Sequence, residues 1–337
     1  MSNKMKAMVL AAPGGPEALQ SRSVDIPWPA ADGDVLVRLK AAALNPADGY
    51  FRAFGPYVDT GSPCILGHDA AGIVEQVGSD VKHIQIGQRV CFCNGGIGAH
   101  FGTYAEFAVV PESQLSLIPE AVDDATAAAL PLVFITAWEA LQERAAVKSG
   151  DFVLIHAGAG GTGHMAVQLA TELGGRVATT VSSEEKIALV GKFGAERAIA
   201  YRHEDFAEVA RDWTAGHGID VALDNLGPEI FQKTIATMAA YGRLVTLMGM
   251  PADDAEETAY VNNLTIHNVM MLTPMLLGMQ QRLDHQATLV AKGLAMLEQG
   301  KLLVHIDSRY DFDDIAAAHE KLDAGTTTGK IVIDIAS

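Results

Sequence analysis

The stretch VLIHAGAGGTGHMAVQLA, residues 153–170, constrains the fold more than any other part of the sequence. Its glycines follow an apolar, strand-like run and precede an amphipathic, helix-like run. In such a unit the glycines permit a tight turn and a close approach of the backbone to a pyrophosphate, which lies at the positive N-terminus of the helix. A glycine-rich surface turn is the alternative, but it does not require the strand before and the helix after. The stretch predicts a dinucleotide site with the binding residues Gly158, Gly160, Gly161, Thr162 and Gly163.

The rest of the chain shows two kinds of sequence pattern. From about residue 125, strand-like runs such as RVATTV (176–181) and IDVALDN (219–225) alternate with helix-like runs. Such alternation predicts a parallel, doubly wound sheet. Before about residue 120, short β-like runs are bounded by turn residues, which predicts a smaller β-rich domain. The sequence therefore predicts an α/β fold with two domains.

Charge and hydropathy exclude several classes of partner. The chain has 24 basic and 41 acidic residues and a formal net charge of −17, so its surface repels phosphate backbones and anionic membranes. No run approaches the ~20 apolar residues of a spanning helix, and the N-terminus lacks the apolar core of a signal peptide. We expect a cytoplasmic protein that binds neither nucleic acid nor membrane.

The end of the second predicted strand indicates which dinucleotide binds. An NAD site usually has an acidic residue about 20 residues after the glycine loop, where it bonds the ribose 2′-hydroxyl. Here the strand ends at Ser182 and Ser183, with no carboxylate before Glu184. Small hydroxyls leave room for a 2′-phosphate, which Lys186 and Tyr201 could reach. The prediction is NADPH, although Glu184 and its neighbour oppose it and Lys186 could be a solvated helix residue.

A second motif, PCILGHDAAGIVEQVG (63–78), raises the question of a metal at His68. A catalytic zinc needs three protein ligands and an open position. The chain has three cysteines, Cys64, Cys91 and Cys93, and so small and odd a number argues against a disulfide framework. Cys91 and Cys93 would face the same side of one strand, but no further Cys or His cluster completes a site. Buried thiols are the favoured interpretation.

Together, five segments resemble the medium-chain dehydrogenase/reductase superfamily, and in particular its zinc-free, zeta-crystallin-like quinone oxidoreductase branch. They are LNPADGYFR (44–52), LGHDAAGIVEQVG (66–78), GTYAEFAVVP (102–111), VLIHAGAGGTG (153–163) and GKIVIDI (329–335). The resemblance implies a GroES-like β-rich catalytic domain, residues 1–125 and 276–337, and a Rossmann domain, residues 126–275. The C-terminus would thus fold back into the first domain.

The resemblance also bears on the metal. Zinc dehydrogenases similar to this chain place a Cys at the position of Asn45 and a ligand near Thr136, where this chain has no Cys, His or acid. They carry a four-cysteine lobe where this chain has only CFCNGGIGAHF (91–101). Neither Cys64 nor His100 falls at a ligand position of that pattern. We therefore expect no metal, and a His68 that is structurally satisfied.

Three residues match the family's nicotinamide pocket: Asn45, Tyr50 and Thr136. Asn45 could donate its amide to the substrate oxygen or position the cofactor ribose. Tyr50 could donate a hydrogen bond or a proton, although an unperturbed phenol with a pKa near 10 is a reluctant acid; solvent is the alternative proton source. In the plainer interpretation, Asn45 belongs to an ordinary turn with Pro46, and Tyr50 packs among neighbouring aromatic residues.

Further cofactor contacts are expected at strand ends and near the C-terminus. Asn225, Gly249 and Met250 end predicted parallel strands, where such ligands bind. By the resemblance, the remaining contacts are Leu272, Thr273 and Lys330. The methionine-rich run 270–279 is interpreted either as an apolar edge strand in a homodimer, which relatives commonly form, or as an adaptable wall for hydrophobic substrates.

These expectations converge on NADPH-dependent, zinc-independent reduction of a small hydrophobic quinone or α,β-unsaturated carbonyl. Conjugation already activates such an electrophile, so hydride addition requires mainly hydrogen-bond donors and a proton for the resulting oxyanion. An enoyl-thioester reductase or a zinc-independent alcohol dehydrogenase is the enzymatic alternative. A non-catalytic NADPH-binding protein, acting in a structural, redox-sensing or RNA-associated role, is the third.

Overall fold

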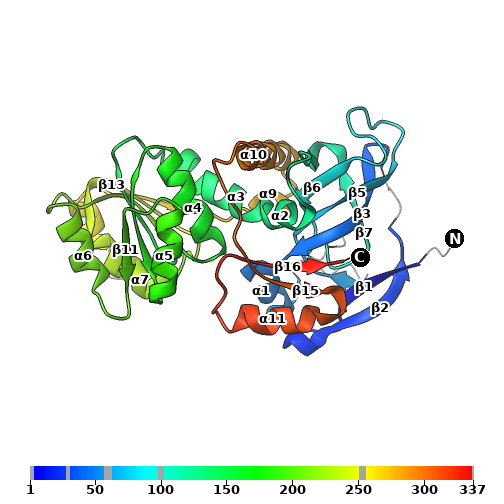
Figure 1. Cartoon of the computed structure of the whole chain (residues 1–337), viewed down its shortest axis with the longest axis horizontal. Helices are drawn as coiled ribbons and strands as arrows, with labels where there is room; N and C mark the ends of the chain where they lie inside the picture. The colour runs from blue at the N-terminus through cyan, green and yellow to red at the C-terminus, as the bar shows by residue number, and fades with distance from the viewer. Residues whose placement is uncertain (1–3, 28–30, 57–62, 98–101, 250–255, 336–337) are drawn as a thin grey trace. The chain divides into compact units, whose positions relative to one another are not determined.

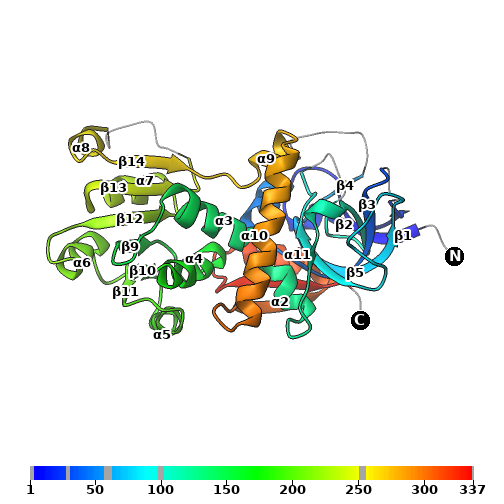
Figure 2. The ribbon, with the colours of Figure 1, turned by 90° about the horizontal axis from the view of Figure 1, so that it is seen from above.

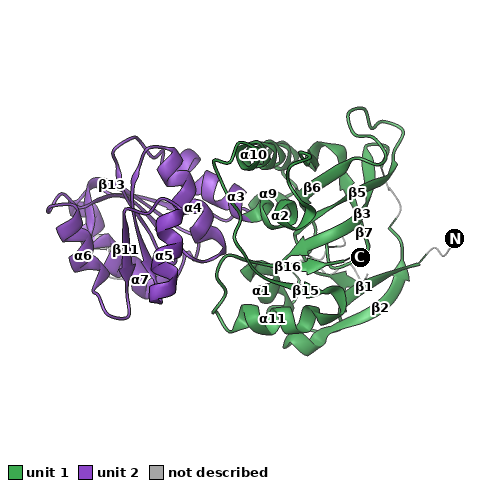
Figure 3. Ribbon diagram, in the orientation of Figure 1, with its two compact units in different colours: residues 1–132, 272–337 green, residues 133–271 purple. Residues whose placement is uncertain are grey.

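The computed structural model describes residues 4–27, 31–56, 63–97, 102–249 and 256–335 and confirms the predicted α/β fold class (Figure 1). The chain divides into two compact units (Figure 3). Unit 1 comprises residues 1–132 and 272–337, and unit 2 comprises residues 133–271. The domain ends expected from the sequence, 125/126 and 275/276, remain predictions.

Unit 2 contains a six-stranded parallel sheet with the strand order β11-β10-β9-β12-β13-β14. This is the order of a doubly wound dinucleotide fold, in which the chain reverses direction across the sheet between β9 and β12. The strands are β9 (Phe152–Ile155), β10 (Arg176–Val181), β11 (Arg197–Ala200), β12 (Ile219–Asp224), β13 (Met238–Thr246) and β14 (Thr265–Asn268). The helices are α4 (Gly161–Glu172), α5 (Glu184–Lys192), α6 (Phe206–Trp213), α7 (Pro228–Ile235) and α8 (Glu256–Val261).

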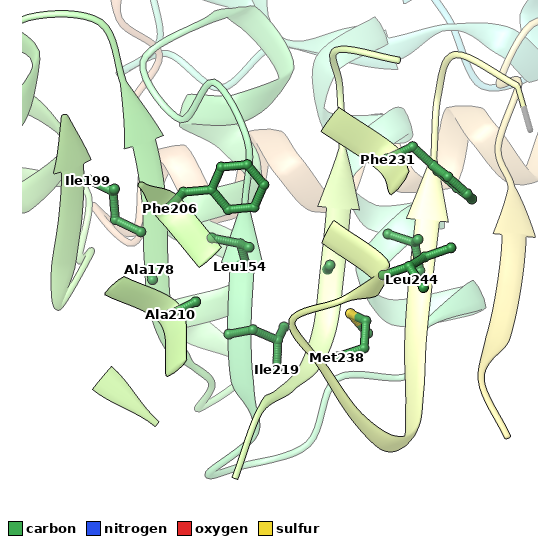
Figure 4. Packing of buried hydrophobic residues seen from close by; sticks show 11 residues of the cluster. Leu154, Ala178, Ile199, Phe206, Ala210, Ile219, Phe231, Met238 and Leu244 are labelled. Carbon is green, nitrogen blue, oxygen red and sulfur yellow. The ribbon is translucent and has the colours of Figure 1, made fainter. Parts of the chain in front are cut away.

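The core of unit 2 explains why its strands are apolar runs. The central strands of a parallel sheet are buried on both faces, so they carry continuous hydrophobic sequence rather than alternation. Phe206 of α6 and Phe231 of α7 pack against the sheet residues Leu154, Ala178 and Leu244 (Figure 4). This packing fixes the strand ends from which the cofactor loops emerge.

Unit 1 is built on two sheets. The larger has the order β15-β16-β3-β5-β6-β8, with β7 paired to β3, and the smaller has the order β2-β1-β4. Its strands are β1 (Lys4–Leu10), β2 (Leu19–Asp25), β3 (Asp34–Ala43), β4 (Cys64–Ile65), β5 (Asp69–Val77), β6 (Arg89–Cys93), β7 (Phe107–Pro111), β8 (Ser116–Leu117), β15 (Ile306–Asp311) and β16 (Lys330–Asp334). The last strand, β16, pairs antiparallel with β3.

The helices of unit 1 are α1 (Pro46–Phe54), α2 (Asp124–Ala129), α9 (Thr273–Leu276), α10 (Gln280–Glu298) and α11 (Ile315–Asp323). α2 packs on β3, β5 and β16, whereas α10, the long orange helix of Figure 2, packs on β6 and β8. Among the described residues, no helix is both long enough and apolar enough to cross a membrane.

Two stretches differ from the sequence-based expectation. The helical run around Pro131 is divided into α2 and α3 (Pro131–Trp138), because proline has no N–H to donate into the preceding turn and itself suits a first helical turn. A π-helical segment, Glu139–Arg144, follows α3. The interpretation of the run 270–279 as an edge strand is wrong: β14 ends at Asn268, and Pro274 lies in the first turn of α9.

Candidate active site

The glycine loop of unit 2 follows β9 and leads into α4, as the motif predicts. A Cβ atom on Gly158 would lie 2.0 Å from Thr179 Oγ1, and one on Gly163 would lie 2.0 Å from Ala157 O. These two glycines are therefore required by the chain's own packing. A Cβ on Gly160 meets nothing closer than Ala157 O at 3.3 Å. Gly160, Gly161 and Thr162 are half-exposed at the N-terminus of α4, the end of a helix that attracts a pyrophosphate.

Asn225 follows β12, directly across the reversal point of the sheet from the glycine loop. Its Nδ2 donates to His156 O at 2.7 Å, which ties the end of β12 to the end of β9. Its Oδ1 is buried and has no hydrogen-bond partner among the described residues. A buried acceptor without a donor is costly, so this oxygen is suited to a ligand hydroxyl or amide.

The neighbouring Asp224 shapes the loop that carries Asn225. Its Oδ1 accepts the backbone N–H groups of Leu226 at 2.9 Å and Gly227 at 3.1 Å. Its Oδ2 accepts the hydroxyl of Thr246 at 3.0 Å. This buried carboxylate therefore fixes the loop after β12 to the end of β13.

The predicted 2′-phosphate residues lie at the ends of β10 and β11. Ser182 and Ser183 connect β10 to α5, Lys186 is in the first turn of α5, and Tyr201 donates its backbone N–H to Val181 O at 3.3 Å. Within the described part of the chain, the side chain of Lys186 has no ion pair or hydrogen bond. This cation is therefore available for an anion, although the exposed Glu184 stands in the same turn.

A hollow of about 390 Å³ lies between α5 and the edge strand β11. Its lining includes Ile187, Arg197 and Glu204 but none of the residues predicted to bind the 2′-phosphate. We therefore assign it no part in the candidate site.

The other predicted cofactor residues are divided between the units. In unit 2, Gly249 has φ of 81°, and a Cβ there would meet no atom within 4 Å. Met250 lies outside the described residues. Leu272 and Thr273 belong to unit 1, where Leu272 is buried and Thr273 begins α9.

Unit 1 holds a cluster of buried polar side chains around the start of α1. Asn45 is the N-cap of this helix, and its backbone N–H donates to Asp48 Oδ2 at 2.8 Å, an acidic cap of the first turn. The other oxygen, Asp48 Oδ1, accepts from His68 Nδ1 at 2.6 Å. Asp48 and His68 are both fully buried. One carboxylate thus holds both the helix start and the imidazole.

A second carboxylate, Asp69, organises the Asn45 side chain. Asp69 Oδ2 accepts from Asn45 Nδ2 at 2.9 Å and lies 3.5 Å from Lys330 Nζ, while Oδ1 accepts the backbone N–H of Leu132 at 3.0 Å. Lys330 also donates to Asn45 Oδ1 and to Leu44 O. Asn45 Nδ2 has a second, longer contact to Ala43 O at 3.4 Å. Both amide hydrogens of Asn45 are therefore engaged within unit 1.

Burial and charge set the pKa values of these groups in opposite directions. Burial would raise the pKa of Asp48, but the charge and hydrogen bond of His68 outweigh it, so the pKa is lowered. For Asp69 burial prevails over the nearby Lys330, and the pKa is raised. Burial likewise lowers the pKa of Lys330, against the attraction of Asp69. Asp48 is thus the carboxylate that stays ionised most readily.

A line of hydrogen bonds runs from Asp48 to the surface. The Tyr104 hydroxyl bonds Asp48 and receives His319 Nε2 at 3.1 Å. Arg52 Nε donates to His319 Nδ1 at 3.2 Å, and its guanidinium pairs with Asp323 at 2.6 Å. Because arginine only donates, His319 Nδ1 must be the acceptor, and the ring carries its proton on Nε2, which donates to the Tyr104 hydroxyl. This line fixes the orientation of Asp48.

His68 is satisfied at only one of its two ring nitrogens. Nδ1 bonds Asp48, whereas Nε2 is buried without a hydrogen-bond partner among the described residues. The expectation of a structurally satisfied histidine thus holds for Nδ1 alone. The ring stacks on Phe51 at 5.6 Å between centroids.

The other two predicted catalytic residues lie in different surroundings. Tyr50 is half-exposed on α1, with its ring 4.9 Å from that of Phe54. Thr136 is buried on α3, in unit 2. The catalytic roles of Asn45, Tyr50 and Thr136 remain predictions.

Within the residues described, no group of three or more His, Cys, Asp and Glu side chains could hold a metal ion. The three cysteines are free thiols, and burial, helped by the charge of Asp69, raises the pKa of both Cys91 and Cys93. Independence from zinc remains a prediction.

Sequence reasoning did not identify Asp48, Asp69 and His156 as site residues. The signal for Asp48 was present: Asn45 and Asp48 have the spacing of a helix cap and its third residue. Asp69 carries no comparable signal, because its partners come from β16 and from the start of α3.

Two family models match the chain. Residues 31–120 match the alcohol dehydrogenase GroES-like domain, and residues 193–333 match the zinc-binding dehydrogenase family.

Similar proteins cover nearly the whole chain. A 2-haloacrylate reductase of Burkholderia sp. is 32% identical, covering 97% of this chain and 98% of that protein. A quinone oxidoreductase of Pseudomonas aeruginosa is 33% identical, covering 97% and 99%. Among solved structures, mycobacterial Rv1454c complexed with NADPH has a TM-score of 0.86 at 29% identity, covering 98% of this chain and 100% of that one. These likenesses support a nicotinamide cofactor in the glycine-loop unit.

Proposed function

This chain belongs to the medium-chain dehydrogenase/reductase superfamily of oxidoreductases, and from that premise we propose that it reduces quinones or α,β-unsaturated carbonyls with NADPH and without zinc. Relatives named quinone oxidoreductase and 2-haloacrylate reductase support this substrate class, since both names denote reduction of a conjugated electrophile.

The observation that carries the proposal is the asymmetry of the glycine loop. Gly158 and Gly163 are explained by packing, whereas a Cβ on Gly160 would meet only Ala157 O, at 3.3 Å, and Gly160 is half-exposed at the start of α4. The unpartnered Asn225 Oδ1 lies on the loop that faces it across the sheet reversal. When bound, the cofactor supplies hydride from C4 of its nicotinamide. Ser182, Ser183, Lys186 and Tyr201 support the phosphorylated dinucleotide.

In this proposal Asn45 acts as an acceptor rather than as a donor. Its two amide hydrogens already engage Asp69 and Ala43 O, and its Oδ1 receives Lys330. The capping box also directs the backbone N–H of Asp48 at the Asn45 side chain, so a ligand hydroxyl would share Oδ1 with that contact; as an acceptor, Oδ1 suits a ribose hydroxyl better than a substrate carbonyl oxygen. Lys330 would then act through Asn45, as a positioning residue.

The zinc-free part of the proposal rests on the ligand set, because a catalytic zinc needs three protein ligands and no group of three or more His, Cys, Asp and Glu side chains suited to a metal exists among the described residues. We include in the same proposal a cytoplasmic homodimer, for which the exposed edge strand β14 offers a pairing surface.

The test is NADPH consumption with phenanthrenequinone and with methyl vinyl ketone, in the presence of a strong chelator. NADH, crotonyl-coenzyme A and a simple alcohol with NADP⁺ provide the comparisons. We expect turnover that survives chelation and favours NADPH. Turnover that requires added zinc, or that appears only with the thioester, would contradict the proposal.

A further inference from the structure

His68 differs from the other buried histidines of the chain. His156 bonds Thr180 and Thr234 through its two ring nitrogens, and His319 bonds Arg52 and Tyr104. Only His68, among the described residues, has a buried ring nitrogen without a partner. A purely structural histidine would not leave a nitrogen unsatisfied, because each buried polar atom without a partner costs about 1–3 kcal/mol.

The single partner of His68 is suited to acid–base chemistry. Asp48 Oδ1 bonds Nδ1 at 2.6 Å, so the Nδ1–H faces a carboxylate and Nε2 is the nitrogen that can gain or lose a proton. The lowered pKa of Asp48 keeps this carboxylate ionised, so it accepts the hydrogen bond of the ring. Asp48 is itself held by Asn45 N–H and by Tyr104. The dyad is therefore oriented from two sides.

The dyad also adjoins the residue that we expect near the cofactor. Asn45 and His68 are bonded to the two oxygens of the same carboxylate. The charged groups that interact with the ring are Asp48 and Asp69, and Lys330 Nζ lies 3.5 Å from Asp69.

We propose that the Asp48–His68 dyad is the proton donor of the reduction, acting through His68 Nε2 on the oxygen of the substrate. The inference rests on the proposed function. Hydride adds to the β-carbon of an enone, the C=C π pair forms a new double bond between the α-carbon and the carbonyl carbon, and the C=O π pair moves onto oxygen, which gives an enolate. The Nε2–H bond then breaks and an O–H bond forms, which leaves a neutral imidazole that still donates Nδ1–H to Asp48. Water restores the proton after product release.

The main test uses His68→Asn, whose amide can still donate to Asp48 while the titrating nitrogen is removed. General acid catalysis is worth about 10²–10⁴-fold. We expect kcat for methyl vinyl ketone to fall by about 100-fold, NADPH affinity to stay within about twofold, and the fall of kcat with rising pH to disappear. Ser116→Ala, which removes a buried hydrogen bond to Ala287 O elsewhere in unit 1, is the control and should keep wild-type kcat. Unchanged kcat in His68→Asn would assign the proton to solvent and overturn the inference.

A binding experiment without NADPH separates this inference from the proposed function. Para-nitrophenol imitates the product oxygen, and its absorbance reports its ionisation. We expect the wild-type protein to lower the apparent pKa of the bound phenol by at least one unit, a tenfold effect, and His68→Asn to abolish this. An equal shift in both proteins, or none in either, overturns the inference. If the wild type shifts the phenol but reduces neither substrate, the proposed function fails and the proton donor stands.

Discussion

The glycine loop of unit 2 and the polar cluster of unit 1 are built in opposite ways. The loop depends on the absence of side chains: Gly158 and Gly163 avoid clashes within the chain, and Gly160 leaves room beside the N-terminus of α4. The cluster consists of charged side chains without water access, in which each group depends on its neighbours. A change in the loop should therefore act locally on ligand binding, whereas a change in the cluster should affect the stability of the whole unit.

The largest effect is expected from Asp69→Asn, which leaves Lys330 buried without a countercharge. Breaking a buried ion pair from one side typically costs about 3–5 kcal/mol. Urea unfolding should show this loss, and the double variant with Lys330→Met should regain at least half of it. Glu75→Gln, which breaks the exposed pair with Arg38, is the control and should change stability by less than about 1 kcal/mol. A single variant as stable as the control would show that the pair is not coupled.

The next contrast lies within the loop itself. Gly158→Ala forces a methyl group against Thr179 and should lower stability by about 1–3 kcal/mol. Gly160→Ala meets no such contact, so stability should change by less than about 1 kcal/mol while the Kd for NADPH rises at least about tenfold. Unfolding and NADPH titration of both variants measure this. Equal NADPH affinity in Gly160→Ala and wild type would contradict the assigned pyrophosphate position.

These two predictions show what sequence reasoning can reach. The loop was predicted residue by residue, because Gly158, Gly160 and Gly163 stand at fixed spacing between a strand and a helix. The fold class followed from the alternation of strands and helices. The cluster was not predictable in this way, because Asp48, Asp69 and Lys330 meet only when β5, β16 and α1 are assembled. The methionine-rich run was misread because composition alone does not distinguish an edge strand from a short helix beginning near Pro274.

Low pH should decrease the stability of both units, through one buried histidine in each. Burial lowers the pKa of His156 to about 3 and that of His319 to about 4, from 6.5. In this pH range the unfolded chain therefore binds more protons than the folded chain. The free energy of unfolding falls as pH decreases from about 6.5 toward 4, by at most about 1.4 kcal/mol per pH unit for each group. His319→Gln should reduce this slope in urea unfolding across that range. An unchanged slope would show that His319 titrates alike in both states.

The smallest effect should come from Lys186→Gln, at the exposed edge of the cofactor region. Removing one partly exposed cation from a phosphate costs about 1 kcal/mol or less, so the Kd for NADPH should rise by up to about fivefold while that for NADH is unchanged. Stability should be unaffected. Lys192→Gln, at the other end of α5, is the control. A parallel loss of NADH binding would argue against a 2′-phosphate contact.

The position of β16 also has a consequence for biosynthesis. Unit 2 is one continuous stretch and is complete in the nascent chain before α10 is translated, whereas β16 follows every other described strand of unit 1. Until β16 is made, β3 lacks its antiparallel neighbour, and Asp69, on the earlier strand β5, lacks its partner Lys330. A stop codon placed just before Lys330 should thus leave unit 2 intact while exposing the earlier-translated part of unit 1 to chaperones and proteases.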